Sequence, residues 1–498
     1  MWSMTRAKPI RCSRTSIHSL PNEILAEIFI AGSSTSLEAS GSGRGRTAVL
    51  FTCRVASVDR HWRDLALNLP VIWTTIIISD QRPLTLPARF ITRSGNLPLR
   101  VITCLESNED NKRIVPTVRL LLVCVPRMRS LVLRVNFMTL SRTCFLRLFD
   151  AIAPALEHLD IEMLDEDLDS WEDHVMGDAL RCFLAKGAYR LSSLHLRGDL
   201  LHASPQWFTV TTLDLTLEPC LRPRAWNSFS DLLASCPILK TLVLRGGSFP
   251  IPHADVPELD ILHGSLRTIA LDCRTDMRKP VEIALFLTHL KIPSLKYLEL
   301  FGVSGDTLEA WAAFSKSRTH ISWWSDDPPS YLELNTLRLV CFVPGEHAPS
   351  TDFFDLFPAL HHLELIRSKP THFFPLSPPS CSSGHCDAPA LPHSHSFWPS
   401  LRTLTYDGKD YSWLYDTVQS RQRLGRALSH LRIIDAFYQP LQLKLLKDLV
   451  VVERLVNCDS GYISLHVETD DSLVVSDKWS ARAMWCLFLP LAFLILSY

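Results

Sequence analysis

The chain has 498 residues, and its 51 basic and 52 acidic residues give a formal net charge of −1. This balance favours neither nucleic acid nor an anionic membrane as a partner, because it supplies no global basic bias and no polybasic run. Hydrophobic residues make up 47% of the chain, which excludes global disorder and allows a large core. The 14 cysteines are scattered, and several lie inside apolar runs. We therefore expect a reducing compartment, cytoplasmic or nuclear.

The first elements expected are helices. Residues 1–16 have the composition of a flexible tail, and residues 17–31 predict a helix with Pro21 in its first turn, where the missing N–H costs nothing. The Gly/Ser-rich residues 32–47 predict a loop. A second helical pattern covers residues 48–69, ends at Pro70 and has one apolar stripe. That stripe consists of Val55, Val58, Trp62, Leu65 and Ala66.

Two β-rich runs follow, at residues 71–79 and 97–105. After them, a phrase of the form apolar-x-x-Leu-x-apolar returns at intervals of roughly 20 to 40 residues, which is the signature of a solenoid. The central residues of its copies are Leu131, Leu159, Leu194, Leu213, Leu242, Ile269, Leu298, Leu337, Leu363, Leu404 and Leu431. The phrase predicts one strand for each repeat, with the leucines pointing inward and stacking on the neighbouring repeats.

The connectors between these strands differ in length. Residues 145–153, 229–235, 281–290 and 353–357 have helical patterns, and a proline or glycine stands before many of the strands. Residues 368–398 are rich in Pro, Ser and His and predict a disordered insert outside the packed layers. We expect the solenoid to extend over residues 76–475, with an apolar tail at 476–498.

The repeats resemble leucine-rich repeats, whose core phrase is L-x-x-L-x-L-x-x-N/C-x-L. One repeat fits almost fully, with Met128, Leu131, Leu133, Asn136 and Met138, whereas the others lack the asparagine. The resemblance covers roughly 350 residues and implies an irregular leucine-rich-repeat horseshoe.

The N-terminal segment resembles an F-box, in the style of the large set of F-box proteins in mushroom-forming fungi. Three spaced signals carry this resemblance: Leu20 to Leu25, Trp62 to Ala66, and Ile72-Trp73. The fold class expected is therefore α/β, with an all-α F-box-like module over residues 17–75 followed by the horseshoe. The Gly/Ser-rich loop departs from the family pattern.

The F-box resemblance implies a substrate-recognition subunit of a cullin–RING ubiquitin ligase of the SCF type, with no catalytic activity of its own. The implied contact with a Skp-type adaptor involves Leu20, Pro21, Ile24, Leu25 and Ile28, with Trp62, Leu65 and Trp73 holding the helices together and partly at that contact. Alternatives left open are a helical cap that binds nothing, a scaffold that works without the ligase, and a membrane-tethered repeat protein.

The strand positions between the leucines form a candidate face for an unknown protein substrate. Its candidate residues are Asp160, His195, Asp214, Tyr297, Glu299, Arg338, His362 and Glu364. The alternative is an exposed sheet selected for β-propensity and solubility. The mixed signs of charge argue against a groove that follows nucleic-acid phosphates.

Other segments give weaker signals. Cys381, His385, Cys386, His393 and His395 include metal-ligand types without a zinc spacing, so we expect no metal site and no cofactor. Residues 165–173 are acidic, which a solvated loop explains. Trp323 and Trp324 are either an exposed anchor or packed under a connector. Residues 484–498 are apolar but short for a bilayer span, so they are a cap, a weak anchor or an incorrect gene end. The sequence contains no recognised catalytic motif.

Overall fold

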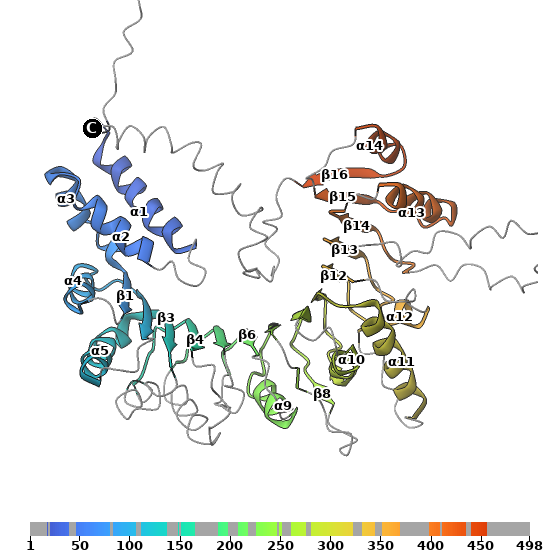
Figure 1. The fold of residues 1–498 in the computed structure, drawn as a ribbon, viewed down its shortest axis with the longest axis horizontal. Coiled ribbons are helices and arrows are strands. Elements are labelled where there is room, and N and C mark those ends of the chain that lie inside the picture. The colour runs from blue at the N-terminus through green and yellow to red at the C-terminus, as the bar shows by residue number, and fades with distance from the viewer. Residues whose placement is uncertain are drawn as a thin grey trace, which may run out of the picture. The chain divides into compact units, whose positions relative to one another are not determined.

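The structure is a computed structural model of the chain. It describes residues 20–38, 46–79, 83–105, 111–136, 151–164, 188–197, 208–217, 226–246, 249–250, 260–274, 280–321, 331–343, 351–368, 398–408, 411–434 and 440–455, together with residues 17 and 148. Its contacts divide the chain into two compact units, Met1–Leu156 and Glu157–Tyr498. Figure 1 labels many of the helices and strands of both units.

The first unit begins with α1 (Asn22–Glu38), α2 (Arg46–Val55) and α3 (Arg60–Leu67). The first predicted helix is present but shifted, because α1 starts at Asn22 and continues to Glu38, into the segment predicted as a loop. A Cβ at Gly32 would overlap the ring of Phe51 on α2. That glycine therefore permits close approach of two helices, which explains its presence inside a helix.

The single helix expected over residues 48–69 is interrupted. α2 ends at Val55, and α3 starts at Arg60 behind the N-cap Asp59. The Asp59 carboxylate accepts a hydrogen bond of 2.7 Å from the backbone N–H of Trp62. Such a cap stabilises a helix start by about 1 kcal/mol. The interruption removes Val58 from the predicted inward stripe and leaves this side chain 49% exposed.

The predicted strand at 71–79 is shorter than expected, because its first residues form a turn of 3₁₀ helix, η2 (Pro70–Trp73). The strands of this unit are β1 (Thr75–Ser79), β2 (Leu99–Leu105) and β3 (Met128–Val135), which pair in parallel. They are connected by α4 (Thr85–Arg93), then by α5 (Asn111–Cys124) with η3 (Val125–Arg127). Asn136, which completes the best copy of the repeat phrase, is buried.

The second unit contains a parallel sheet in which each strand pairs with the strands of the preceding and following repeats. The strands are β4 (His158–Met163), β5 (Ser193–Arg197), β6 (Thr212–Thr216), β7 (Thr241–Arg245), β9 (Thr268–Asp272), β11 (Tyr297–Phe301), β12 (Thr336–Val340), β13 (His362–Ile366), β14 (Thr403–Tyr406), β15 (His430–Ile434) and β16 (Val451–Leu455). The predicted phrases coincide with strands, and β16 is an addition. A separate pair joins β8 (Ile261–Leu262) to β10 (Leu290–Lys291).

The register keeps the leucines of successive repeats level. Leu194 pairs with Leu213, and Leu213 pairs with Leu242. These side chains are at most 1% exposed, because each repeat covers the leucines of the next. Parallel strands contributed one per repeat, with stacked leucines inside, are the arrangement of a leucine-rich-repeat-like solenoid.

Helices fill many connectors of the second unit, and Figure 1 shows α9 to α11 on one side of their strands. The helices are α9 (Trp226–Ala234), α10 (Pro280–His289), α11 (Gly305–Ile321), α12 (Thr351–Asp355), α13 (Tyr411–Arg423) and α14 (Pro440–Lys447). The helical connectors predicted at 229–235, 281–290 and 353–357 are confirmed. Within the predicted helix at 145–153, Leu148 is helical and residues 151–153 are not.

Aromatic side chains join these helices to one another. Trp226 and Phe229 on α9 lie 6.0 and 5.7 Å from the Phe286 ring on α10. The Trp311 ring on α11 lies 5.3 Å from that of Tyr331. The Tyr331 hydroxyl donates to the carbonyl oxygen of Leu287 over 2.6 Å. A buried polar group with such a partner avoids the cost of desolvation, so the Tyr331 hydroxyl is accommodated inside the helical layer.

The residue that follows several strands has a positive φ. Gly246, Gly302, Cys341 and Arg367 come directly after β7, β11, β12 and β13, with φ values of 83°, 71°, 52° and 50°. At Gly246 a Cβ would overlap the carbonyl oxygen of Leu217. Two repeats thus use glycine in this left-handed turn, and two accept the strain of a side chain there.

The described cysteines form no disulfide. Cys124 and Cys236 are buried, and burial raises the pKa of both thiols to about 11. They are therefore protonated at neutral pH and act as small apolar side chains.

Candidate functional site

The N-terminal helices are held together by aromatic side chains. The rings of Phe29 on α1 and Trp62 on α3 lie 5.0 Å apart. The indole Nε1 of Trp73 donates a 2.7 Å hydrogen bond to the carbonyl oxygen of Ala66. Leu25 is 0% exposed, Trp62 6% and Trp73 1%, so these three residues belong to the interior of the helical group.

The residues predicted for the adaptor contact therefore separate into buried and accessible sets. Pro21 and Ile24 are exposed, and Ile24 retains 49% of its accessible area. Leu20, Ile28 and Leu65 are half-buried. Leu25, which the sequence assigned to the same contact, is fully covered by the chain itself. Three further apolar side chains that the contact prediction omitted are exposed: Val58 at 49%, Val71 at 41% and Leu67 at 38%.

The second candidate surface is the sheet face formed by the side chains between the stacked leucines. Asp160, His195 and Asp214 occupy equivalent register positions on β4, β5 and β6, and all three are half-buried. The same position is occupied by Glu299, Arg338 and Glu364 on β11, β12 and β13. The structure thus places the predicted face residues on one surface, in two groups. The first group is Asp160, His195 and Asp214; the second is Tyr297, Glu299, Arg338, His362 and Glu364.

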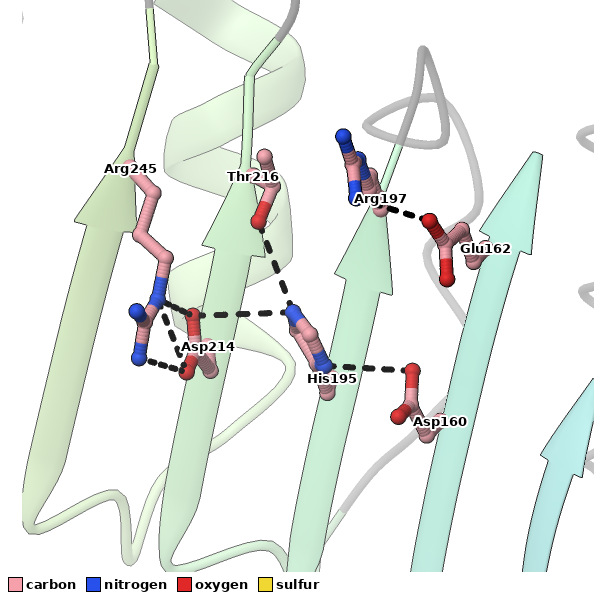
Figure 2. A network of polar contacts seen from close by, with 7 residues as sticks. All are labelled: Asp160, Glu162, His195, Arg197, Asp214, Thr216 and Arg245. Atoms are coloured by element: carbon pink, nitrogen blue, oxygen red, sulfur yellow. Dashed lines mark hydrogen bonds and ion pairs between the residues drawn. The ribbon is translucent and has the colours of Figure 1, made fainter. Parts of the chain in front are cut away.

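The first group is a chain of ion pairs across neighbouring strands, shown in Figure 2. His195 Nδ1 lies 3.1 Å from Asp160 Oδ1, and His195 Nε2 lies 3.9 Å from Asp214 Oδ1. Arg245 donates to both carboxylate oxygens of Asp214, from Nε over 3.0 and 3.3 Å and from Nη2 over 3.0 Å. Two residues beyond His195 and Asp160 on the same strands, Arg197 donates a 2.7 Å hydrogen bond to Glu162.

The two carboxylates determine the charge of the imidazole. Burial alone would lower the pKa of His195, but its hydrogen bond with Asp160 and the negative charges of Asp160 and Asp214 outweigh burial. The pKa of His195 is therefore raised above its usual value of 6.5. Two acids thus hold one imidazole toward its protonated form on a half-exposed surface.

An apolar cluster on the face begins on β7 and β9, between the two groups, and continues on β11 and β12, the strands that also carry Glu299 and Arg338. Val243, Ala270, Phe301 and Val340 lie at successive strands and are at most 8% exposed, with Cys341 and Ile366 packed against them. The Arg274 guanidinium lies 4.4 Å from the centre of the Phe301 ring. A cation over a ring is stabilised by about 0.5–1 kcal/mol where solvent reaches it.

The second group contradicts the expectation of an exposed face. Glu299 is 1% exposed, Arg338 5%, Glu364 5% and Tyr297 8%. Arg338 Nε lies 3.6 Å from Glu364 Oε2, and the Tyr297 hydroxyl donates to Glu299 over 2.9 Å. The alternation of the strand predicted the direction of these side chains, but the bulk of their neighbours on the same face covers them.

Burial decides the protonation of this group. Burial is the main reason that the pKa of Glu364 is raised and the pKa of Tyr297 is raised strongly. Burial also opposes the charge of Arg338, but Glu299, Tyr297 and Glu364 outweigh it and raise its pKa. Arg338 thus remains a cation between two glutamates.

His362 in the same group is neutral. Its Nε2 lies 3.5 Å from Glu364 Oε1 and 2.8 Å from the hydroxyl of Thr405. The carboxylate would favour a proton, yet burial and the positive charges of Arg432 and Arg338 lower the pKa of His362 to about 4. Thr405 and Arg432 were absent from the predicted site, although both stand at the face position of their own repeat phrase.

A hollow of about 630 Å³ adjoins the second group where the strands begin. Lys296, Leu332, Glu333, Asn335, Thr336, Ala359, His361 and His362 line it. Thr336 and His362 are sheet-face residues, whereas Leu332 and Ala359 belong to the preceding turns. The hollow therefore shows that the turns and the sheet face form one continuous surface at these repeats.

The described ranges show neither a metal site nor a membrane-spanning helix. Within them, no group of three or more His, Cys, Asp or Glu side chains could hold a metal ion. None of the helices in those ranges is long and apolar enough to cross a membrane. The segments at 165–173, 323–324, 381–395 and 484–498 that the sequence singled out lie outside the described residues.

Comparison with known proteins adds little. No protein-family model matches the chain, and no curated protein matches it. Among solved structures, it is similar to the TLR13 chain of a TLR13–ssRNA13 complex, with 13% sequence identity and a TM-score of 0.35. The similarity covers 72% of this chain and 41% of that chain, so this chain spans less than half the length of TLR13. At this level of similarity, the neighbour gives no information about partner or mechanism.

Proposed function

We propose that this chain is the substrate-recognition subunit of a cullin–RING ubiquitin ligase. In this proposal α1 to α3 form an F-box-like module that binds a Skp-type adaptor, and the repeat sheet binds the protein to be ubiquitinated. The chain forms no bonds itself. It raises the effective concentration of its client near a ubiquitin-charged enzyme.

The observation that carries the proposal is the apolar surface of the N-terminal helices. Their interior is closed by Phe29, Trp62 and Trp73, yet Ile24 and Val58 remain about half exposed at 49% each. Isolated exposed apolar side chains are common, but several on one small helical group indicate a protein contact. The three F-box signals at Leu20–Leu25, Trp62–Ala66 and Ile72-Trp73 stand on these same helices and on η2.

In this proposal the predicted residues have different roles, which their exposure supports. Pro21 and Ile24 offer direct contacts, and Leu20, Ile28 and Leu65 border them. Leu25, Trp62 and Trp73 hold the helices in position and act on the adaptor only through that packing.

Adaptor binding tests the proposal. Purified full-length chain is passed over immobilised Skp-type adaptor, and binding is compared for the wild type, Ile24→Asp and Val123→Asp. Val123 is a matched control, because it is an apolar residue of α5 with 63% exposure. We expect Ile24→Asp to weaken binding at least tenfold, since a charge at a buried contact costs more than about 1.4 kcal/mol. Val123→Asp leaves binding unchanged.

The outcomes separate the functional alternatives. A wild-type chain that fails to bind the adaptor at micromolar concentration overturns the ligase proposal and favours a scaffold that works without the ligase. If Ile24→Asp binds the adaptor as tightly as the wild type does, the assignment of the α1 surface is overturned. Far-ultraviolet circular dichroism shows that each variant remains folded.

A further inference from the structure

Two neighbouring repeats of the second unit carry large aromatic side chains in the turns that precede their strands. Two residues before the first buried apolar residue of a repeat, the usual residue is proline, as in Pro237, Pro293, Pro358 and Pro399. Before β5 and β6 this position holds Tyr189 and Phe208. Their exposed fractions are 70% and 55%, so two large rings stand in solvent on neighbouring repeats.

This position, two residues before the first buried apolar residue, lies in the turn that precedes the strand. It belongs to the same surface as the sheet face. Leu332 occupies it in the repeat of β12, two residues before the buried Leu334. Leu332 lines the hollow together with the face residues Thr336 and His362. By the same repeat geometry, Tyr189 and Phe208 border the face that carries Ser193 and Thr212. The neighbouring turns are joined by a 2.8 Å hydrogen bond from Thr209 Oγ1 to the carbonyl oxygen of Leu191.

Taken over the whole second unit, the sheet face that these rings border has an acidic excess. The face positions within strands β4 to β16 carry seven carboxylates and four guanidinium groups. The carboxylates are Asp160, Glu162, Asp214, Asp272, Glu299, Glu364 and Glu453, and the guanidinium groups are Arg197, Arg245, Arg338 and Arg432.

Asp160 has capacity for another cation. Asp214 is paired with Arg245, and Glu162 is paired with Arg197. Among the described residues, the carboxylate of Asp160 pairs with His195 alone, and its side chain is 33% exposed. A carboxylate has about four acceptor sites, so most of those on Asp160 remain open to a basic group that arrives from solvent (Figure 2).

We propose that Tyr189, Phe208 and Asp160 form a docking surface for an extended segment of a protein partner. The segment carries an apolar side chain that covers the rings and a basic side chain that pairs with Asp160. Tyr189 precedes His195 by six residues, and His195 pairs with Asp160 in the sheet register, so the two contacts are at most about 20 Å apart. About six residues of extended chain cover that distance. This inference rests on the proposed role of the repeat sheet as the client-binding face.

The acidic excess favours a basic protein segment over a nucleic acid, because carboxylates repel phosphates. Exposed aromatic side chains beside a charge are the residue types that dominate the energy of protein interfaces. The two features together define a recognition element with one apolar and one basic residue.

The test uses short synthetic peptides with one arginine and one phenylalanine in a glycine–serine background. Their separation is varied residue by residue, and binding to the full-length chain is measured by fluorescence anisotropy without adaptor. We expect the tightest binding at one preferred separation of about six residues or fewer. We expect Asp160→Asn to weaken peptide binding about tenfold, because it removes the basic contact. We expect a similar loss of affinity with Tyr189→Ser and with Phe208→Ser, because each removes one ring of the apolar contact.

Matched controls lie elsewhere on the same unit. Asp416→Asn removes an exposed carboxylate from α13, and Leu445→Ser removes a 49% exposed apolar side chain from α14. Both leave peptide binding unchanged. Binding without a preferred separation, equal binding when glutamate replaces the arginine, or tighter binding of single-stranded RNA overturns the inference. The adaptor takes no part in this assay, so its result and that of the adaptor experiment fail independently.

Discussion

The two polar groups lie on the same face of the sheet but have opposite electrostatic character. His195 in the first group has a raised pKa, because Asp160 and Asp214 flank it on a half-exposed surface. His362 in the second group has a pKa lowered to about 4, because it is buried beside Arg338 and Arg432. The repeat thus fixes where a side chain points, whereas the residues of neighbouring repeats decide its charge.

The arginines of the two groups differ in the same way. Arg245 binds both oxygens of Asp214, and the side chains of this pair are 27% and 20% exposed. Arg338 lies between Glu299 and Glu364 with 6% of its side chain exposed. Water stabilises the charges of the first pair, but in the second group each charge depends on the others.

The largest expected difference between the groups follows from removing each arginine. Arg338→Met leaves two buried carboxylates without their cation, so we expect it to lower the free energy of unfolding by about 3–5 kcal/mol. Arg245→Met breaks a partly solvated pair and costs about 1 kcal/mol or less. Urea unfolding followed by circular dichroism measures both values.

A compensated variant sharpens this prediction. The combination of Glu299→Gln, Arg338→Met and Glu364→Gln removes all three charges, so it recovers most of the loss caused by Arg338→Met alone. Equal costs for Arg338→Met and Arg245→Met would show that burial does not distinguish the two groups.

The second prediction concerns His362 and acid. Its pKa is about 4 in the folded chain and 6.5 as an ordinary value, so the unfolded chain binds the proton first as the pH falls. Stability is therefore lost progressively from about pH 6.5 toward pH 4, by about 3 kcal/mol for this group. His362→Gln keeps a hydrogen-bonding group beside Thr405 but does not titrate. If the imidazole is the cause, the wild type loses about 3 kcal/mol of stability relative to the variant between neutral pH and about pH 4, as urea unfolding measures; parallel curves would contradict it.

The third prediction, the smallest effect, concerns His195. Its contribution to stability changes with pH in the opposite direction to that of His362. The folded pKa of His195 is raised, so its stabilising contribution is present below the unfolded value of 6.5 and is lost as the pH rises through the folded pKa. His195→Gln should therefore cost more stability in mild acid than in mild alkali. The effect is small because the side chain is 35% exposed and salt screens its ion pairs. Urea unfolding of the wild type and His195→Gln across this pH range, in low and in high salt, measures the effect. A loss of stability that does not depend on pH would refute the role of the two aspartates.

The strands could be predicted from the sequence because their leucines recur at a fixed spacing within each phrase. Leu213 and Leu242, for example, are separated by a long connector, yet the phrase around each is the same and the register aligns them. The interruption between α2 and α3 was missed, because it depends on the cap made by Asp59 rather than on apolar spacing. The length of α1 was missed because the contact of Gly32 with Phe51 is tertiary.

At the candidate sites, the sequence likewise did not predict which side chains are buried. Ile24 and Leu25 are adjacent and both lie on the predicted apolar face, but Leu25 is fully buried and Ile24 is half exposed. The helical period places Ile24 at the edge of that face and Leu25 inside it, but packing decides how much of the edge is covered. The burial of Glu364 depends on side chains contributed by other repeats, among them Arg338. By contrast, the aromatic residues Tyr189 and Phe208 interrupt a proline pattern that is visible in the sequence itself.

The order of the strands has a mechanical consequence. Within the second unit, each strand is hydrogen-bonded only to the strands of the preceding and following repeats in the described sheet. A force that pulls β4 away from β16 therefore passes through every intervening ladder in series. Such an array is as strong as its weakest ladder, so it yields one repeat at a time and absorbs tension stepwise as it extends.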